Sequence, residues 1–244
     1  MIGVTGRRCG FVVGTICLFV VCQLAWGSPS GLNNIPTTDV VPEKKLVLQT
    51  WLNLAENMHP QQYVGFKAGP LKGVEFGVDW KANDNVHGHA TLQAKYGFDI
   101  KKDLLRGVIG IADLSDDCEH NGYYFPYAAT SLDIDIFRLH FGYAPQPHNE
   151  RFFAGIDKTF PFLNRNLQLK GDAIHINDRE DVLFSAGFLY ELAPLDNGGG
   201  AAPEGLLGVL DKFLRNIILE GWVSMPSTGD QEVFTLKVNY VISF

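Results

Sequence analysis

The feature of this sequence that most limits its fold is a repeated alternation of apolar and polar residues. The C-terminal run FTLKVNYVISF has an apolar residue at every second position, and only Val241 breaks the polar set between them. Side chains alternate across a β-strand, so one face of such a strand is apolar and the other mostly polar. Similar runs occupy residues 73–81, 89–100, 135–143 and 182–191. Each is longer than the usual strand of ~5–6 residues.

Weaker alternation fills the intervals between these runs. It predicts further strands at residues 45–54, 62–69, 104–113, 123–131, 151–157, 167–176 and 216–225, which brings the expected total to about twelve. Short turns at residues 69–73 and 132–134 alternate with longer polar connections at 82–88, 114–122 and 145–150. Short turns at one end and long loops at the other are typical of an up-and-down barrel.

One connection on the short-turn side differs from the others. Residues 192–215 contain NGGG followed by PEGLLGVLDKFLR, in which Pro203 suits a first helical turn. Apolar residues then recur at helical spacing, at Leu206, Leu207, Leu210, Phe213 and Leu214. We expect one short amphipathic helix near residues 203–215. It caps the mouth of the barrel, folds into the lumen or lies at a bilayer interface; the sequence leaves all three positions open.

The composition of the two strand faces separates a membrane barrel from a secreted soluble β-sandwich, which is the alternative. Sandwich strands are usually shorter, and their outer faces carry more charge. Here only 19% of residues are charged. Aromatic residues near strand ends are typical of interfacial girdles, and they include Trp80, Tyr96, Phe98, Tyr143, Tyr190 and Tyr240. Because lipid cannot hydrogen-bond to the backbone, every backbone polar group must pair within the protein, so such strands must close into a barrel. The expected fold is therefore all-β: a transmembrane up-and-down antiparallel barrel of about twelve strands over residues 44–244.

The N-terminus has the pattern of a targeting segment. Arg7 and Arg8 precede an uncharged run, and Ala25-Trp26-Gly27 supplies small residues at the positions a signal peptidase reads. We expect a signal peptide at residues 1–27 and an extended segment at 28–43; an uncleaved membrane anchor is the alternative. Only Cys118 lies beyond residue 27, so no internal disulfide is expected there.

The terminal strand resembles the C-terminal β-signal of Gram-negative outer-membrane barrels. Its expected assembly residues are Phe234, Leu236, Val238, Tyr240, Ile242 and Phe244. The resemblance implies export through a signal peptide, delivery to the outer-membrane assembly machinery and residence in the outer membrane of a Gram-negative bacterium.

A second resemblance covers about a fifth of the chain. GLNNIPTTDVVPEKKLVLQ, residues 31–49, resembles the opening of YjbH-type exopolysaccharide-associated outer-membrane proteins, with Gly31, Pro36, Thr37 and Pro42 in place. Thr38 stands where that group often has Ala. YVGFKAGPLKGVEFGVDW, residues 63–80, is similar to the hairpin that follows in that group. This chain is far shorter than those proteins, so the resemblance supports a barrel more than a role in polysaccharide export.

Few residues suggest chemistry. The chain has no Gly-x-Ser-x-Gly, phosphate loop or His-Glu-x-x-His motif and implies no cofactor. The formal charge of −7, without a basic stripe, argues against nucleic acid as a partner. His87 and His89 would bind a metal only with an added carboxylate, so no metal site is predicted. The chain is expected not to be an enzyme. The alternative is a barrel lipid hydrolase centred on His175, although Ser185 and Ser224 are expected to face inward.

We therefore expect a non-enzymatic barrel, either a narrow pore or a structural or export-associated surface protein. Its partners would be the lipid bilayer and a small solute or polysaccharide, and its oligomeric state stays open. Twelve strands leave a small interior. The expected lumen-lining residues are Glu75, Asp79, Lys81, Lys95, Asp99, Arg138, His140, Asp172, Glu191 and Lys237. Mutual ion pairing is a better explanation for them than solute selection.

Overall fold

The structure is a computed structural model. It describes residues 31–82, 90–115, 124–145, 150–176, 181–194, 206–229 and 231–244. The expectations for the signal peptide at residues 1–27, for His87 and His89, and for Cys118 lie outside these residues.

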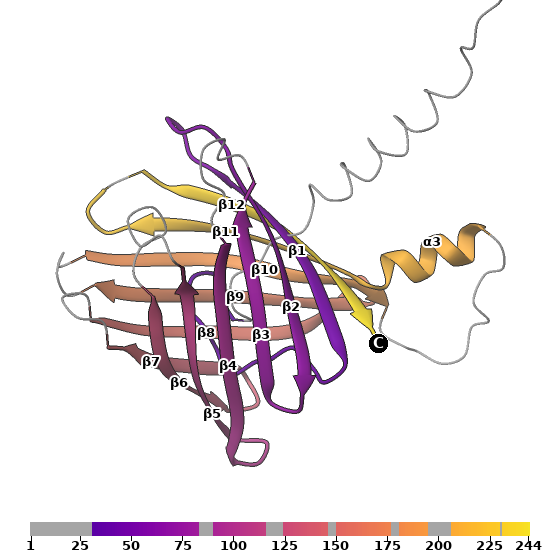
Figure 1. The fold of residues 1–244 in the computed structure, drawn as a ribbon, viewed down its shortest axis with the longest axis horizontal. Helices are drawn as coiled ribbons and strands as arrows, with labels where there is room; N and C mark the ends of the chain where they lie inside the picture. The colour runs from indigo at the N-terminus through magenta and orange to yellow at the C-terminus, as the bar shows by residue number, and fades with distance from the viewer. Residues whose placement is uncertain are drawn as a thin grey trace, which may run out of the picture.

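Twelve strands make up a single antiparallel sheet (Figure 1). Their bounds are β1 Lys45–Leu54, β2 Gln61–Leu71, β3 Val74–Lys81, β4 Ala90–Lys101, β5 Leu105–Leu114, β6 Phe125–Asp133, β7 Arg138–Ala144, β8 Arg151–Phe162, β9 Arg165–Ile176, β10 Asp181–Pro194, β11 Ile217–Pro226 and β12 Val233–Ser243. From β2 to β12, each strand pairs with its neighbours in sequence order.

The sheet closes on itself through β1. This strand pairs with β12 along its whole length, from Lys45 opposite Ser243 to Leu54 opposite Phe234. On its other side β1 lies along β2, where the rings of Trp51 and Tyr63 stack with centroids 5.0 Å apart. The predicted up-and-down barrel of twelve strands is confirmed, and the sandwich alternative is wrong because one sheet closes instead of two sheets packing face to face.

One strand is much longer than its sequence pattern predicts. The alternation indicated a strand at residues 151–157, whereas β8 continues to Phe162. Pro161 and the loss of alternation hide this extension, but Phe162 pairs with Arg165 of β9. Leu163 and Asn164 form the two-residue turn with φ of 50° and 59°, as a tight hairpin turn with two left-handed residues requires.

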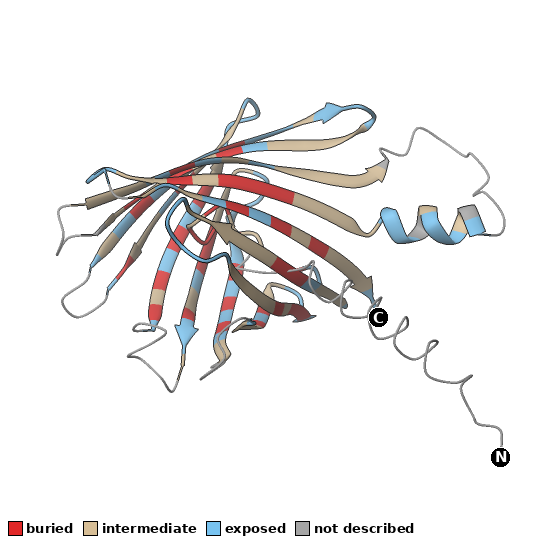
Figure 2. Ribbon diagram, turned by 90° about the horizontal axis from the view of Figure 1, so that it is seen from above, coloured by how far each residue is buried: buried red, intermediate tan, exposed pale blue. Residues whose placement is uncertain are grey.

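Buried and exposed residues alternate along the strands (Figure 2). The buried set is mostly polar and many large apolar residues are exposed, the reverse of the usual pattern in a soluble domain. Large apolar side chains are exposed on the outer face, among them Phe76, Leu92, Tyr96, Ile109, Phe141, Phe152, Ile156, Leu169, Phe184, Phe188, Phe234 and Leu236. Polar side chains alternate with them and are buried on the inner face, among them Gln49, Lys67, Glu75, Gln93, Lys95, Ser131, His140, Asp157, Lys170, Asp172, Glu220, Lys237 and Asn239.

A short helix, α3 Leu206–Leu214, precedes β11. It lies outside the barrel, at the rim formed by the short turns and near the C-terminus (Figure 1). The predicted short helix is confirmed. No helix among the described residues is long and apolar enough to cross a membrane.

Candidate functional site

The barrel interior contains part of the chain's own N-terminal region. Residues 31–43, called here the luminal segment, begin with a tight turn in which the Leu32 N–H donates to the Ile35 carbonyl at 3.1 Å and Gly31 forms a β-bridge with Pro36. Most side chains from Leu32 to Thr38 are buried. Sequence analysis treated these residues as an extended segment before the barrel and did not predict that they occupy the lumen.

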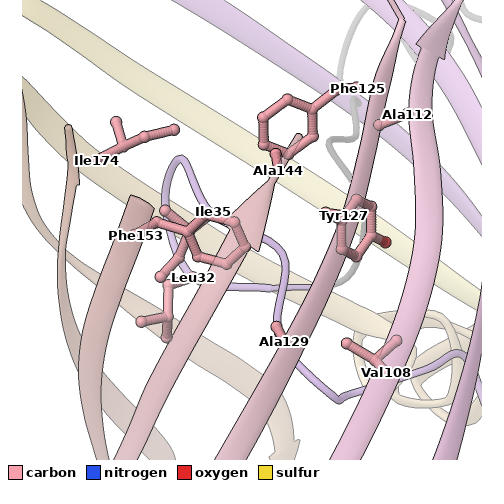
Figure 3. Close-up of a cluster of buried hydrophobic side chains, with 10 residues drawn as sticks. All are labelled: Leu32, Ile35, Val108, Ala112, Phe125, Tyr127, Ala129, Ala144, Phe153 and Ile174. Atoms are coloured by element: carbon pink, nitrogen blue, oxygen red, sulfur yellow. The ribbon is translucent and has the colours of Figure 1, made fainter. Parts of the chain in front are cut away.

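Apolar contacts hold the first part of the luminal segment, at Leu32 and Ile35. Leu32 and Ile35 are almost fully buried and belong to a cluster completed by Val108, Ala112, Phe125, Tyr127, Ala129, Ala144, Phe153 and Ile174 (Figure 3). Gly155 of β8 makes room for this packing, because a methyl group added there would lie only 2.3 Å from Leu32 Cδ1.

Hydrogen bonds fix the turn to the neighbouring strands β9, β10 and β11. The backbone N–H groups of Asn33 and Asn34 both donate to Asp172 Oδ2, at 2.8 and 3.1 Å. The two asparagine side chains donate to Ser185 Oγ and Ser224 Oγ, each at 2.9 Å. Because Ser185 also donates to Asp172 at 2.6 Å, backbone, amide and carboxylate form one connected network across β9, β10 and β11.

The later part of the segment is held by ion pairs of Asp39. Arg138 Nη1 and Nη2 donate to the two carboxylate oxygens of Asp39 at 2.7 and 2.8 Å, and Arg106 lies 3.9 Å from the same carboxylate. Burial raises the pKa of Asp39, but the charge and hydrogen bonds of Arg138 outweigh it and lower the pKa to about 2. Arg138 also donates to Asp157 at 2.8 Å, so one guanidinium joins the segment to the wall.

Further contacts take the segment across the barrel. The Val41 N–H donates to Glu75 Oε2 at 2.7 Å, and Lys95 Nζ donates to the Thr37 carbonyl at 3.4 Å. The Thr38 N–H donates to Ser131 Oγ at 3.4 Å. Together with the bonds above, the segment is tied to β3, β4, β6, β7, β9, β10 and β11, so it spans the lumen from wall to wall.

A second polar network in the lumen does not involve the luminal segment. Glu220 of β11 pairs with Lys170 of β9 and, at 2.8 Å, with Lys237 of β12. Asn239 donates to Glu220 at 2.7 Å and accepts from Gln49 of β1 at 2.9 Å. The buried Glu220 carboxylate is thus paired with two lysines and an amide. The network links four strands around the point where the sheet closes.

The expected lumen-lining residues fall into several groups. Glu75, Lys95, His140, Asp172 and Lys237 are buried and hydrogen-bonded. Arg138 is partly buried, Asp79 and Lys81 border a cavity, Asp99 lies at the rim 3.3 Å from Arg106, and Glu191 accepts from Asn166 at 2.7 Å. They are therefore not brought together in one site.

Three interior residues that sequence analysis did not select are Asp157, Glu220 and Lys67. Asp157 accepts from Arg138 and is 2.8 Å from His140 Nε2. Lys67 is fully buried, and its Nζ has no hydrogen-bond partner among the described residues. The signal that could have found them is the alternation of inward and outward side chains along a strand, which is weak in all three of these strands.

Beside the luminal segment lies a cavity of about 420 Å³. Asn34, Ile35 and Pro36 of the segment contribute to its lining. The strands add Trp51, Asn53, Tyr63, Asp79, Lys81, Thr91, Ala112, Asp113, Phe125, Arg151 and Ile174. Two acidic and two basic side chains balance formally, beside a stacked aromatic pair. The volume is within the range of small-molecule sites.

The structure offers little for the hydrolase alternative. His175 Nδ1 has no hydrogen-bond partner among the described residues. Ser185 and Ser224 bind the asparagines of the luminal segment instead. In the described parts of the chain, no group of three or more His, Cys, Asp or Glu residues is arranged to hold a metal ion.

Fold and interior together define a class: a closed single-sheet barrel with an apolar outer face and a polar, paired inner face. Among solved structures, the KdgM porin shares this fold, with a TM-score of 0.57, 12% sequence identity, and coverage of 82% of this chain and 99% of that one. The KdgM porin in complex with disordered oligogalacturonate matches with a TM-score of 0.57 at 13% identity and the same coverage.

Comparisons of sequence add no family. No family model matches the chain, and no curated protein matches it significantly. The YjbH-type resemblance and the C-terminal assembly signal therefore stay predictions.

Proposed function

We propose that this chain is an outer-membrane β-barrel channel for small polar solutes, held closed by its own luminal segment. The observation that carries the proposal is the polar, ion-paired lumen crossed by residues 31–43. An interior needed only for stability would be filled by wall side chains. This one instead accommodates residues 31–43, the part of the chain that directly precedes β1.

The outer face supports placement in a bilayer. Its exposed apolar side chains would be costly in water and favourable against hydrocarbon, and a closed sheet leaves no backbone edge unpaired. Aromatic pairs lie on this face, such as Tyr96 with Phe98 and Tyr143 with Phe152, whose centroids are 5.9 and 4.8 Å apart. Export through residues 1–27 and assembly through Phe234 to Phe244 complete the proposal.

The lining of the cavity beside the segment favours a small, polar solute of low net charge. Asp79 and Asp113 equal Lys81 and Arg151 in number, so the lining has no formal excess of one sign to attract a strongly charged ion. The Trp51–Tyr63 stack offers an apolar surface beside hydrogen-bonding groups. A saccharide-sized solute would suit this chemistry, and the oligogalacturonate complex of the KdgM porin gives that size class some support.

The test compares the full chain with a variant lacking residues 31–41, each reconstituted in planar bilayers and in liposomes loaded with neutral sugars of increasing size. We expect small, infrequent conductance from the full chain, and larger conductance with faster sugar efflux from the variant. Heat-modifiable gel migration of both proteins serves as the folding control, since a detergent-stable barrel shifts on boiling.

Two results would overturn the proposal. If the variant folds and conducts no better than the full chain, the segment does not close the pore. If neither protein conducts or releases sugar although both are folded, the barrel is a structural or export-associated surface protein instead.

A further inference from the structure

Helix α3 carries an apolar stripe that is largely exposed. Leu206, Val209 and Leu210 are 83%, 68% and 50% exposed, and Phe213 and Leu214 continue the row. Their spacing places all five on one side of the helix. Gly208 lies on the opposite side. Asp211 accepts from Arg215 Nε at 2.6 Å, so charged groups flank the stripe but do not interrupt it.

The helix is fixed to the end of the barrel. The Asn216 N–H donates to the Phe213 carbonyl at 3.2 Å, and the Val241 N–H donates to the Asn216 carbonyl at 2.8 Å. The rings of Phe213 and Tyr240 pack with centroids 5.1 Å apart. Tyr240 lies on the same face of β12 as the exposed Leu236. The stripe therefore continues the apolar outer surface of the barrel.

Two of the three positions that the sequence left open do not fit. The lumen is crossed by the luminal segment, and both views show α3 extending away from the barrel end without covering the mouth or entering it (Figures 1 and 2). Exposed apolar residues on one face are the feature that remains to be explained.

We propose that α3 lies in the headgroup region of the leaflet on the short-turn side, with its stripe against the acyl chains. The inference rests on the proposed function, since it requires the barrel to cross a bilayer. Amphipathic helices of this kind sit about 5–10 Å into the interface. Nine residues span only about 14 Å. That is too little surface for a stable protein interface of ~1,200 Å² or more, so lipid is a better occupant than a second copy of the chain.

The test uses single cysteines, in a background without the native ones, at Val209 on the stripe, Gly208 on the opposite side and Leu236 on the strand face. Each carries an environment-sensitive fluorophore in bilayers whose lipids are brominated near either the carbonyl or the methyl end. Iodide serves as the aqueous quencher, and each labelled protein is first checked for heat-modifiable migration.

We expect the Val209 label to emit at shorter wavelength than the Gly208 label, to be quenched most by the shallow bromines and to be shielded from iodide. The Gly208 label should show the reverse, and the Leu236 label should be quenched by the deeper bromines. If the Leu236 label meets bromine while the Val209 label meets iodide, the inference about α3 is wrong and the membrane barrel stands. If the Val209 label is shielded from both quenchers, protein and not lipid covers the stripe.

If neither the Val209 nor the Leu236 label is quenched by bromine, the proposed membrane barrel itself fails. The Leu236 label thus separates failure of the helix proposal from failure of the function on which it rests.

Discussion

The contact between Asp39 and Arg138 offers the sharpest test of closure by the luminal segment. Substituting Asp39→Asn removes the negative charge and keeps a side chain of nearly the same shape. Arg138 would retain Asp157, its second carboxylate partner. The wall should therefore stay intact while the segment loses its strongest polar attachment, so the change acts on docking more than on barrel stability.

The size of the effect follows from exposure and geometry. Hydrogen bonds to charged groups contribute about 1.5–3 kcal/mol when well shielded. The side chain of Asp39 is 38% exposed and that of Arg138 21%, so solvent screening reduces the value toward that of a surface pair. We take about 1 kcal/mol, which raises the undocked population about fivefold. Asp39→Lys should act more strongly, because it places a third positive charge beside Arg138 and Arg106.

The assay is single-channel recording, with the fraction of time spent in the larger conductance state as the measured quantity. That fraction should rise about fivefold for Asp39→Asn and further for Asp39→Lys. Asp103→Asn is the matched control, since Asp103 lies on a short turn with its side chain 85% exposed and carries the same charge change. Equal open fractions in the wild type, the Asp39 variants and the control would refute closure by the docked segment.

Three further predictions follow from the same geometry. Gly155→Leu should displace Leu32 and increase conductance, whereas Gly171→Ala should not, because its added methyl would meet its nearest neighbour at an ordinary 3.4 Å; equal currents would contradict this. With a pKa near 2 when docked against an ordinary value of 3.8, the Asp39 carboxyl favours docking fully above about pH 4 and loses that effect as the pH falls toward 2. Currents should therefore rise over that interval by more in the wild type than in Asp39→Asn, and parallel curves would count against the assignment. Glu220→Ala leaves two buried lysines without their shared partner, so it should lower the unfolding free energy in detergent by about 3–5 kcal/mol, measured by denaturant titration against wild type; a loss under 1 kcal/mol would show that the lysines find other partners.

The strands were readable from the sequence because alternation is a local property. β1 matches its predicted bounds, and most others agree within a few residues, since each apolar face must be continuous to cover the barrel. β8 was cut short at residue 157, where alternation fails although pairing with β9 continues to Phe162. There the partner strand, and not the local pattern, determines the structure.

The luminal segment could not be read in the same way. Asn33 bonds to Asp172 and Ser185, which lie 139 and 152 positions further along the chain. A short stretch rich in Asn, Thr and Pro has no periodicity to place it in a barrel, and its partners are recognisable only after the sheet has closed. The sequence gives one indirect sign of the segment, an inward-facing glycine such as Gly155. The strand itself does not require a glycine there, so its lack of a side chain indicates that something packs against it.

The interior is thus filled in two ways, and the difference determines how a pathway can open. Around β9, β11, β12 and β1, wall side chains such as Lys170, Glu220 and Lys237 bond to one another. Opening that side would separate buried charges, which is costly. On the side of β8, Gly155 leaves space that Leu32 and Ile35 occupy. If the segment leaves, the space beside Gly155 becomes empty and no strand pairing is broken. A solute path should therefore open by movement of residues 31–43 while the sheet stays closed.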